Sequence, residues 1–255
     1  MDPTRAIPLD IQLAAANEWW RLAGVDLVFE DEPRAWLRDD ADIEGQGAQP
    51  AQNGAGALVS ADAPAPRLGG EPGGLPGDLA AFREWWLADP SLEIDGTGPR
   101  IAPTGDAGAQ LMILVPMPES DDRQRLLCGK EGNLVASMIA AMGLGPESVY
   151  LASALPGHMA DPDWPDLAQR GLGAVLRHHV ALVGPERLLV LGRGIPPLLG
   201  HDPAQGSAAI KKTAIQAGSR AWEVPTLAGF APDRLLQNAR QRASLWRRWL
   251  DWTDA

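Results

Sequence analysis

Short apolar runs alternate with helical patterns along the second half of the chain. Four runs have the length and apolar content of buried strands, at 111–115, 148–155, 187–192 and 222–227. Apolar positions at helical spacing predict helices over 129–144, 164–184 and 231–252. This alternation is typical of a parallel sheet covered by helices on both faces. The pattern therefore predicts a three-layer α/β/α sandwich with a four-stranded, mainly parallel sheet.

The front of the chain divides into three parts. Residues 9–23 have helical spacing, so 1–38 is predicted to be an N-terminal helical leader. Residues 39–77 are rich in Ala, Gly, Pro, Gln and Asp and hold almost no large apolar residue, which predicts a flexible linker. A predicted helix over 78–88 then opens the α/β domain, which we expect to span 78–255.

Charge is distributed unevenly along the chain. The formal net charge of −11 argues against generic binding of nucleic acid. However, residues 1–166 hold 10 Lys and Arg against 27 Asp and Glu, whereas residues 167–255 hold 12 against 6. The basic second part could face a polyanion, although solvated helix faces are the more ordinary explanation.

Composition also bears on where the protein is located in the cell and on which cofactors it can bind. No run of about 18 apolar residues occurs, so we expect no membrane span. The N-terminus, MDPTRAIPLD, lacks the basic and apolar regions of a signal peptide, so we expect the protein in the cytoplasm. The single cysteine, Cys128, cannot supply an iron–sulfur cluster alone, and the histidines show no metal-ligand spacing. We therefore expect no metal and no cofactor.

The first predicted strand leads into an unusual loop, in MILVPMPESDD at 112–122. Two prolines follow the apolar run, and then three acids, Glu119, Asp121 and Asp122. In α/β folds, a loop at the carboxyl end of a strand is where active sites lie. A solvated loop edge is the favoured interpretation of these acids, and a catalytic role is the alternative.

Four segments together resemble the uracil-DNA glycosylase superfamily, and its family 4 most closely. CGKEGNLVASMIAAMGLGPESVYLASAL (128–155) is similar to the family's VGRAGQLLDKMLAAIGL and EDVYITNVV patterns. RLLVLGRGIPPLLG (187–200) resembles its strand followed by LGxxAxxxLLG, and FAPDRLLQNARQRASLW (230–246) resembles its HPxxLLRNPxxKxxVW helix. NEWWRLAGVDLVFEDEPRAWL (17–37) is similar to a leader in some bacterial members. The order of these segments along the chain also agrees with the family.

The resemblance implies a site that removes uracil from DNA after flipping it out of the stack. In the family, an acid in a GEAPG loop activates water or stabilises the sugar cation. An Asn reads the uracil edge, and a His in an HP motif donates to the uracil oxygen. These positions fall on Pro116, Ser153 and Ala231, none of which supplies the required group. The family's cluster cysteines have no counterparts, so the resemblance predicts the fold without its catalytic groups.

Other side chains near these positions are candidates for a rewired pocket. Glu119 or Asp121 could supply a displaced acid. His158 could replace the lost histidine in part, although a histidine on a surface loop is the favoured interpretation. Met117 or Phe230 could instead fill the pocket with apolar atoms.

Basic residues in the second part of the chain are candidates for phosphate contacts. They are Lys211 and Lys212, in a predicted loop between the third and fourth strands, and Arg234 and Arg240, in the last predicted helix. Arginines on the outer face of an amphipathic helix are expected in any case. The clustered tryptophans are predicted to pack into the core rather than to form an exposed patch, with Trp85, Trp86, Trp246, Trp249 and Trp252 among them.

Three functions are compatible with this sequence. The first is a non-catalytic uracil-DNA glycosylase-like protein that binds DNA or a repair partner. The second is a working DNA glycosylase with a rewired pocket that uses Glu119, Asp121 or His158. The third is a protein-interaction module that uses the acidic leader. A pocket wide enough for a pyrimidine, with a carboxylate pointing in, would favour the second function; a pocket filled by Met117 or Phe230 would favour the first.

Overall fold

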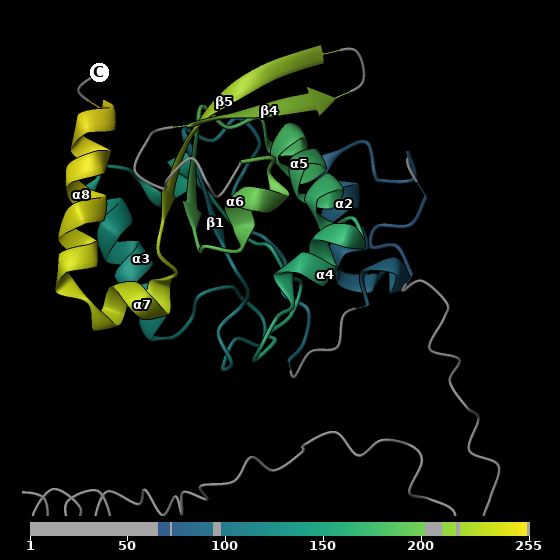
Figure 1. Cartoon of the computed structure of the whole chain (residues 1–255), viewed down its shortest axis with the longest axis horizontal. Helices are drawn as coiled ribbons and strands as arrows, with labels where there is room; N and C mark the ends of the chain where they lie inside the picture. The colour runs from purple at the N-terminus through teal and green to yellow at the C-terminus, as the bar shows by residue number, and fades with distance from the viewer. Residues whose placement is uncertain (1–65, 72, 94–97, 202–210, 218–219, 254–255) are drawn as a thin grey trace, which may run out of the picture. The chain divides into compact units, whose positions relative to one another are not determined.

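The computed structural model describes residues 66–71, 73–93, 98–201, 211–217 and 220–253 (Figure 1). The leader predicted over 1–38 lies outside these residues, as does most of the linker predicted over 39–77. The described residues all belong to one compact unit of the chain, Ser60–Ala255.

Five strands form one sheet, and four of them are parallel. They are β1 (Leu111–Val115), β2 (Val149–Ser153), β3 (Arg187–Leu191), β4 (Lys211–Ala217) and β5 (Arg220–Gly229). Their order across the sheet is β2-β1-β3-β5-β4, and β4 runs antiparallel to β5. The predicted α/β class and mainly parallel sheet are confirmed, whereas the predicted number of strands, four, is wrong.

The additional strand is β4, where the sequence predicts a loop that contains Lys211 and Lys212. Among the side chains of β4 that are described, only Thr213 and Ile215 are buried, and Lys212 and Gln216 are exposed. A strand with one buried aliphatic side chain has almost no hydrophobic pattern in its sequence. Its formation depends on pairing with β5, from Thr213 opposite Val224 to Gln216 opposite Ala221.

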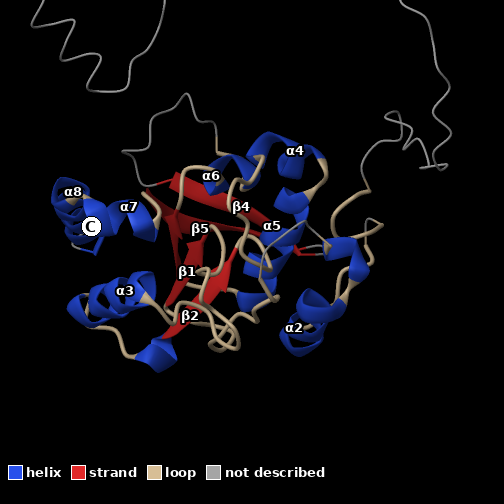
Figure 2. Ribbon diagram, turned by 90° about the horizontal axis from the view of Figure 1, so that it is seen from below, coloured by secondary structure: helices blue, strands red, loops and turns tan. Residues whose placement is uncertain are grey.

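Helices cover both faces of the sheet (Figure 2). They are α2 (Leu79–Ala88), α3 (Lys130–Ala141), α4 (Trp164–Gln169), α5 (Leu172–Val183), α6 (Ile195–Leu198), α7 (Pro232–Gln237) and α8 (Ala239–Thr253). Two short 3-10 turns, η2 (Pro90–Leu92) and η3 (Pro146–Ser148), complete the elements. None of the helices in the described part of the chain combines the length and apolar character needed to cross a bilayer.

Two helices predicted as continuous are each broken once. The helix predicted over 164–184 divides at Gly171, whose φ of 99° lies in the left-handed region that favours glycine. The helix predicted over 231–252 divides at Asn238, whose backbone is extended and whose side chain accepts from the N–H groups of Arg240 and Gln241. Asn238 therefore begins α8 as an N-cap, which hydrophobic spacing alone does not reveal.

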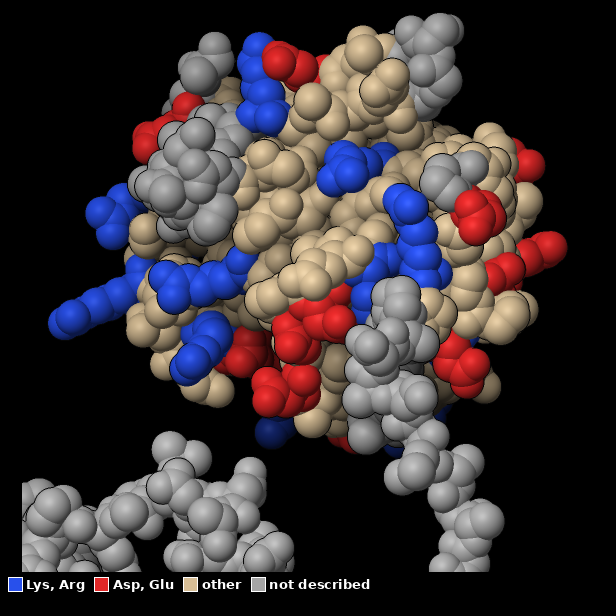
Figure 3. All heavy atoms as spheres, turned by 45° about the vertical axis from the view of Figure 1, so that its right-hand side comes forward, with Lys and Arg blue, Asp and Glu red and all other residues tan. Residues whose placement is uncertain are grey.

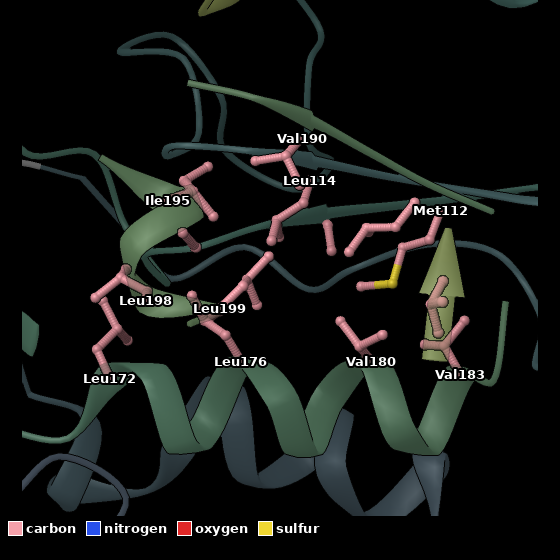
Figure 4. Close-up of a cluster of buried hydrophobic side chains, with 14 of the residues drawn as sticks. Met112, Leu114, Leu172, Leu176, Val180, Val183, Val190, Ile195, Leu198 and Leu199 are labelled. Carbon is pink, nitrogen blue, oxygen red and sulfur yellow. The ribbon is translucent and has the colours of Figure 1, made fainter. Parts of the chain in front are cut away.

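The core lies on both faces of the sheet, because every residue of β1 is buried. On one face, Met112 and Leu114 point toward Leu176 and Val180 of α5, and α6 packs beside them (Figure 4). On the other face, side chains of α3 and α8 pack against Ile113, β3 and β5. Strands buried on both sides read as continuous apolar runs, which is why the sequence predicts β1 and β3 correctly.

The described end of the predicted linker packs against the domain. Leu68 is 3% exposed, and its N–H donates to the carbonyl of Arg170 at 2.8 Å. The ring Nε2 of His178 lies 2.7 Å from the carbonyl oxygen of Pro76. Residues 66–71 and 73–77 are therefore held by α4 and α5, and the prediction of a flexible linker is wrong for them. Composition misses this because one buried leucine is enough to anchor the segment.

A buried polar pair links α2 and α5 to the sheet. The hydroxyl of Tyr150 and Nε2 of His179 lie 2.9 Å apart, and both residues are fully buried. The ring of Phe82 on α2 lies 4.3 Å from that of His179, and the indole of Trp86 donates to the carbonyl of Ile101. Trp86 is buried, as are Trp249 and Trp252, which confirms their predicted place in the core.

The burial of His179 predicts how stability depends on pH. Desolvation, with a smaller contribution from the Arg83 guanidinium, lowers the pKa of His179 to about 3. Between pH 6.5 and 3 the unfolded chain therefore binds a proton that the folded chain does not, so acid favours unfolding in this window. We expect the free energy of unfolding in urea to fall from pH 7 to pH 5. We expect a shallower fall in the His179→Gln variant.

A matched control separates the general loss of stability in His179→Gln from the loss of the titrating imidazole. Ser153→Ala also removes a buried hydrogen bond, from the Ser153 hydroxyl to the carbonyl of Leu155. It removes no titrating group, so its unfolding curve should keep the wild-type pH slope at lower stability. A His179→Gln protein with the wild-type slope would contradict the assignment.

Candidate functional site

Four parallel strands end at one edge of the sheet, and the residues that follow them surround a cleft. Segments 116–120, 158–164, 192–194 and 230–234 follow β1, β2, β3 and β5, respectively. The cleft between them has a volume of about 810 Å³. This is the size of a pocket for a small molecule or a flipped nucleotide. Its place is the one that α/β folds use for binding and catalysis.

The carboxylate of Glu119 holds the β1 loop against the start of α3. Its Oε1 accepts from the N–H groups of Gly129 and Gly132, at 3.0 and 2.9 Å, and its Oε2 accepts from Glu131 at 3.2 Å. A Cβ on Gly129 would lie 2.4 Å from Oε2 of Glu119, so glycine is needed there. These N–H groups have no partner inside the helix, and a negative charge at this end is favourable.

Asp122 fixes the second half of the same loop. It is 2% exposed and accepts from the N–H groups of Glu119, Leu127 and Cys128, at 2.8 to 2.9 Å. Leu127 has a φ of 60°, which is rare for a residue with a side chain. The solvated loop edge predicted for these acids is therefore wrong for Glu119 and Asp122. Only Asp121 is exposed, and it does not line the cleft.

Glu131, in the first turn of α3, is the carboxylic acid in the cleft with the most perturbed ionisation. Burial raises the pKa of Glu131 to about 7, and the nearby carboxylates of Glu119, Asp233 and Asp122 add to the rise. Its carboxylate has no hydrogen bond or ion pair with any described residue. Glu131 was not among the residues predicted from the sequence. An acid in the first turn of a helix is common, and the carboxylates near Glu131 come close to it only in the folded structure.

Aromatic and cationic side chains form other parts of the lining. The guanidinium of Arg193 lies over the ring of Phe230, 5.2 Å from its centroid. Trp164 lies against Gly194, where a Cβ would come within 2.4 Å of the indole, so glycine lets the ring approach the backbone. Acidic side chains gather between groups of Lys and Arg on one face of the molecule (Figure 3). A ligand with an aromatic ring and an anionic group matches this set of side chains.

His158 lines the cleft and ties two of its loops together. Its Nδ1 donates to the carbonyl of Pro118 at 2.9 Å, because a carbonyl oxygen can only accept. The ring is half-buried and lies on the loop that follows β2. Its second ring nitrogen is the one left to face a ligand.

The three positions that the family resemblance marks lie near this edge, without the family's groups. Pro116 and Ala231 line the cleft and offer only apolar atoms. Ser153 is 2% exposed, and its hydroxyl donates to the carbonyl of Leu155 at 2.7 Å, so it turns away from any ligand. Met117 and Phe230 line the cleft but leave it open.

The residues predicted to contact phosphates are scattered. Arg234 is exposed and lines the cleft, whereas Arg240 is exposed on α8 outside it. Lys212 lies on β4 and pairs with Glu223 at 2.9 Å. Lys211 begins β4, and its side chain is outside the description. Of the three whose side chains are described, only Arg234 therefore belongs to the cleft.

The chain does not provide the ligands of the family's iron–sulfur cluster. Cys128 is the single cysteine and is exposed, whereas such a cluster needs several thiolates. Within the described ranges, no group of three His, Cys, Asp or Glu side chains is arranged to hold a metal ion.

Comparison with known proteins adds no family to this description. No protein-family model matches the chain, and no curated protein matches it.

The contacts of Glu119 predict a structural role for this acid. Replacing it by alanine leaves three N–H groups at the start of α3 without an acceptor, so we expect Glu119→Ala to lower the free energy of unfolding by about 2–3 kcal/mol. Asp121→Ala removes an exposed acid two residues away and should cost less than about 0.5 kcal/mol. Urea denaturation measures both, and equal effects would contradict the role assigned to Glu119.

Proposed function

We propose that this protein is a uracil-DNA glycosylase-like domain that binds a base of single-stranded DNA in the cleft but does not excise uracil by the family's mechanism. One observation carries the proposal. The positions of the family's acid, of its uracil-binding Asn and of its HP-motif His are occupied by Pro116, a buried Ser153 and Ala231. None of the family's three groups therefore faces the open cleft. Each such group contributes orders of magnitude in rate.

Binding of DNA is supported by the remaining lining. Trp164 and Phe230 offer rings on which a base can stack, and Arg193 and Arg234 offer positive charge for phosphates. The net charge of −11 opposes strong or generic binding, so the expected affinity is modest and depends strongly on salt.

A working hydrolase is the second candidate. The open cleft and the carboxylate in its lining are the features expected of this function, whereas the replacement of all three family groups favours the first candidate. In this alternative, the protonated Glu131 gives its proton to the departing nitrogen as the bond between C1′ and the base breaks. Water adds to C1′ and releases a proton. A pKa of about 7 suits a general acid at neutral pH. Neither Glu119 nor Asp121 fits this role, since the first is bound to α3 and the second lies outside the cleft.

Excision under single-turnover conditions distinguishes the two candidates. The substrate is a single-stranded oligonucleotide with one uracil, the protein is in large excess, and alkaline cleavage reveals abasic sites. We expect no product above a control without protein. Product that disappears in Glu131→Gln and persists in Asp121→Asn would overturn the proposal and establish the hydrolase.

Two arginine variants, one inside the cleft and one outside it, test the binding of DNA. We expect Arg234→Gln to weaken binding of a labelled oligonucleotide of about 12 thymidines by about threefold to tenfold at low salt. It should also reduce the slope of log Kd against log salt by about one. Arg240→Gln removes an equally exposed arginine outside the cleft and should change neither quantity. Equal effects of the two variants, or no binding by the wild type, would contradict the proposed function.

A further inference from the structure

The cleft contains a half-buried acid, Glu131, to which no described residue offers a hydrogen bond. Glu119 shares the cleft, but both of its oxygens accept from α3. Glu131 lies beside it with no hydrogen bond to any described residue, and it lines the same space as Trp164, Phe230 and Arg193. A ring bound against those aromatic side chains would have its polar edge within the same cleft as this carboxyl group.

The two protonation states of a carboxyl group recognise different base edges. A neutral carboxyl offers one donor and one acceptor side by side, whereas a carboxylate offers two acceptors. Thymine presents N3–H beside a carbonyl oxygen, which matches only the neutral form. Guanine presents N1–H beside O6, which matches the neutral form, and N1–H beside the N2 amino group, which matches the carboxylate.

We propose that Glu131 reads the edge of the bound base: its protonated form pairs with an edge that offers one donor beside one acceptor, and its ionised form pairs with an edge that offers two donors. This inference rests on the proposed function, because it names the group that recognises a base in the same cleft. It assigns recognition of the base to Glu131, a position that has no such role in the family resemblance.

The surroundings of Glu131 hold it near the balance between the two forms. Burial and the acids around it raise its pKa to about 7. The charged and titratable groups that line the same space are Glu119 on the β1 loop, His158 after β2, Arg193 after β3, and Asp233 and Arg234 on α7. The buried Asp122 carboxylate also acts on Glu131, from within the β1 loop. The affinity for thymine relative to guanine should therefore fall as pH rises from 6 to 8, because guanine has an edge for each form and thymine only for the neutral one.

The test compares two nucleotides that carry the same phosphate. The Kd of thymidine 5′-monophosphate, divided by that of deoxyguanosine 5′-monophosphate, cancels the shared contribution of the phosphate and of nearby histidines to pH dependence. For the wild type, we expect this ratio to rise about tenfold from pH 6 to pH 8, as the protonated fraction of an acid with a pKa near 7 falls by that factor. Backbone NMR shifts during titration give both constants.

The Glu131→Gln variant is the matched control. A glutamine amide offers one donor and one acceptor at every pH, so this variant should bind thymidine monophosphate at pH 8 as the wild type does at pH 6. Its Kd ratio should not change with pH. Asp121→Asn, which lies outside the cleft, should keep the wild-type rise.

Each result decides between the two proposals. A ratio that stays constant in the wild type, or that rises equally in Glu131→Gln, would overturn the reading role of Glu131. Absence of binding of both nucleotides would also overturn it. The proposed function would stand after either result if the oligonucleotide of thymidines still binds and Arg234→Gln weakens that binding.

Discussion

Parallel pairing of the central strands is the constraint on which the rest of the molecule depends. β1 pairs with β2 on one side and with β3 on the other, and β5 follows β3 in the same direction. Because all four strands point the same way, their carboxyl ends lie at one edge, and so do the loops that leave them. The cleft exists because these loops must separate toward helices on opposite faces of the sheet.

Acidic residues at this edge have divided between two roles. The carboxylates of Glu119 and Asp122 accept hydrogen bonds from backbone N–H groups, and these bonds make the β1 loop rigid. Burial is the largest cause of the raised pKa of Glu131, and the negative charge of these two acids adds to it. The same carboxylates therefore both fix the loop beside the cleft and contribute to the ionisation of the acid inside it. The β1 loop thus contributes to the electrostatics of the site, although Pro116 at its start has no ionisable group.

The fold was predictable to the extent that burial imposes a pattern. Strands buried on both faces, such as β1 and β3, give apolar runs that nothing else in the chain imitates. β4 was not predictable, since one face of it is exposed and its partner supplies its stability. The breaks at Gly171 and Asn238 depend on local backbone geometry that hydrophobic spacing does not report.

The location of the candidate site was predictable from the sequence, but the roles of its side chains were not. Positions after β1 and β5, including Pro116, Met117 and Ala231, do line the cleft. Glu131 was missed because its raised pKa comes first from burial and then from the carboxylates of Glu119 and Asp233, and sequence spacing reports neither. Ser153 could not be assigned from its type alone, since its hydroxyl is satisfied by a backbone carbonyl two residues away.

The bonds of Glu119 also bear on the order in which the chain folds. They join residues only 10 to 13 positions apart, so closing this loop costs little conformational entropy. Pairing of β1 with β3, by contrast, must bring Leu111 to Arg187 across a much longer stretch of chain. The unit made of β1, its loop and α3 therefore has a kinetic advantage as an early nucleus, onto which the more distant strands can dock.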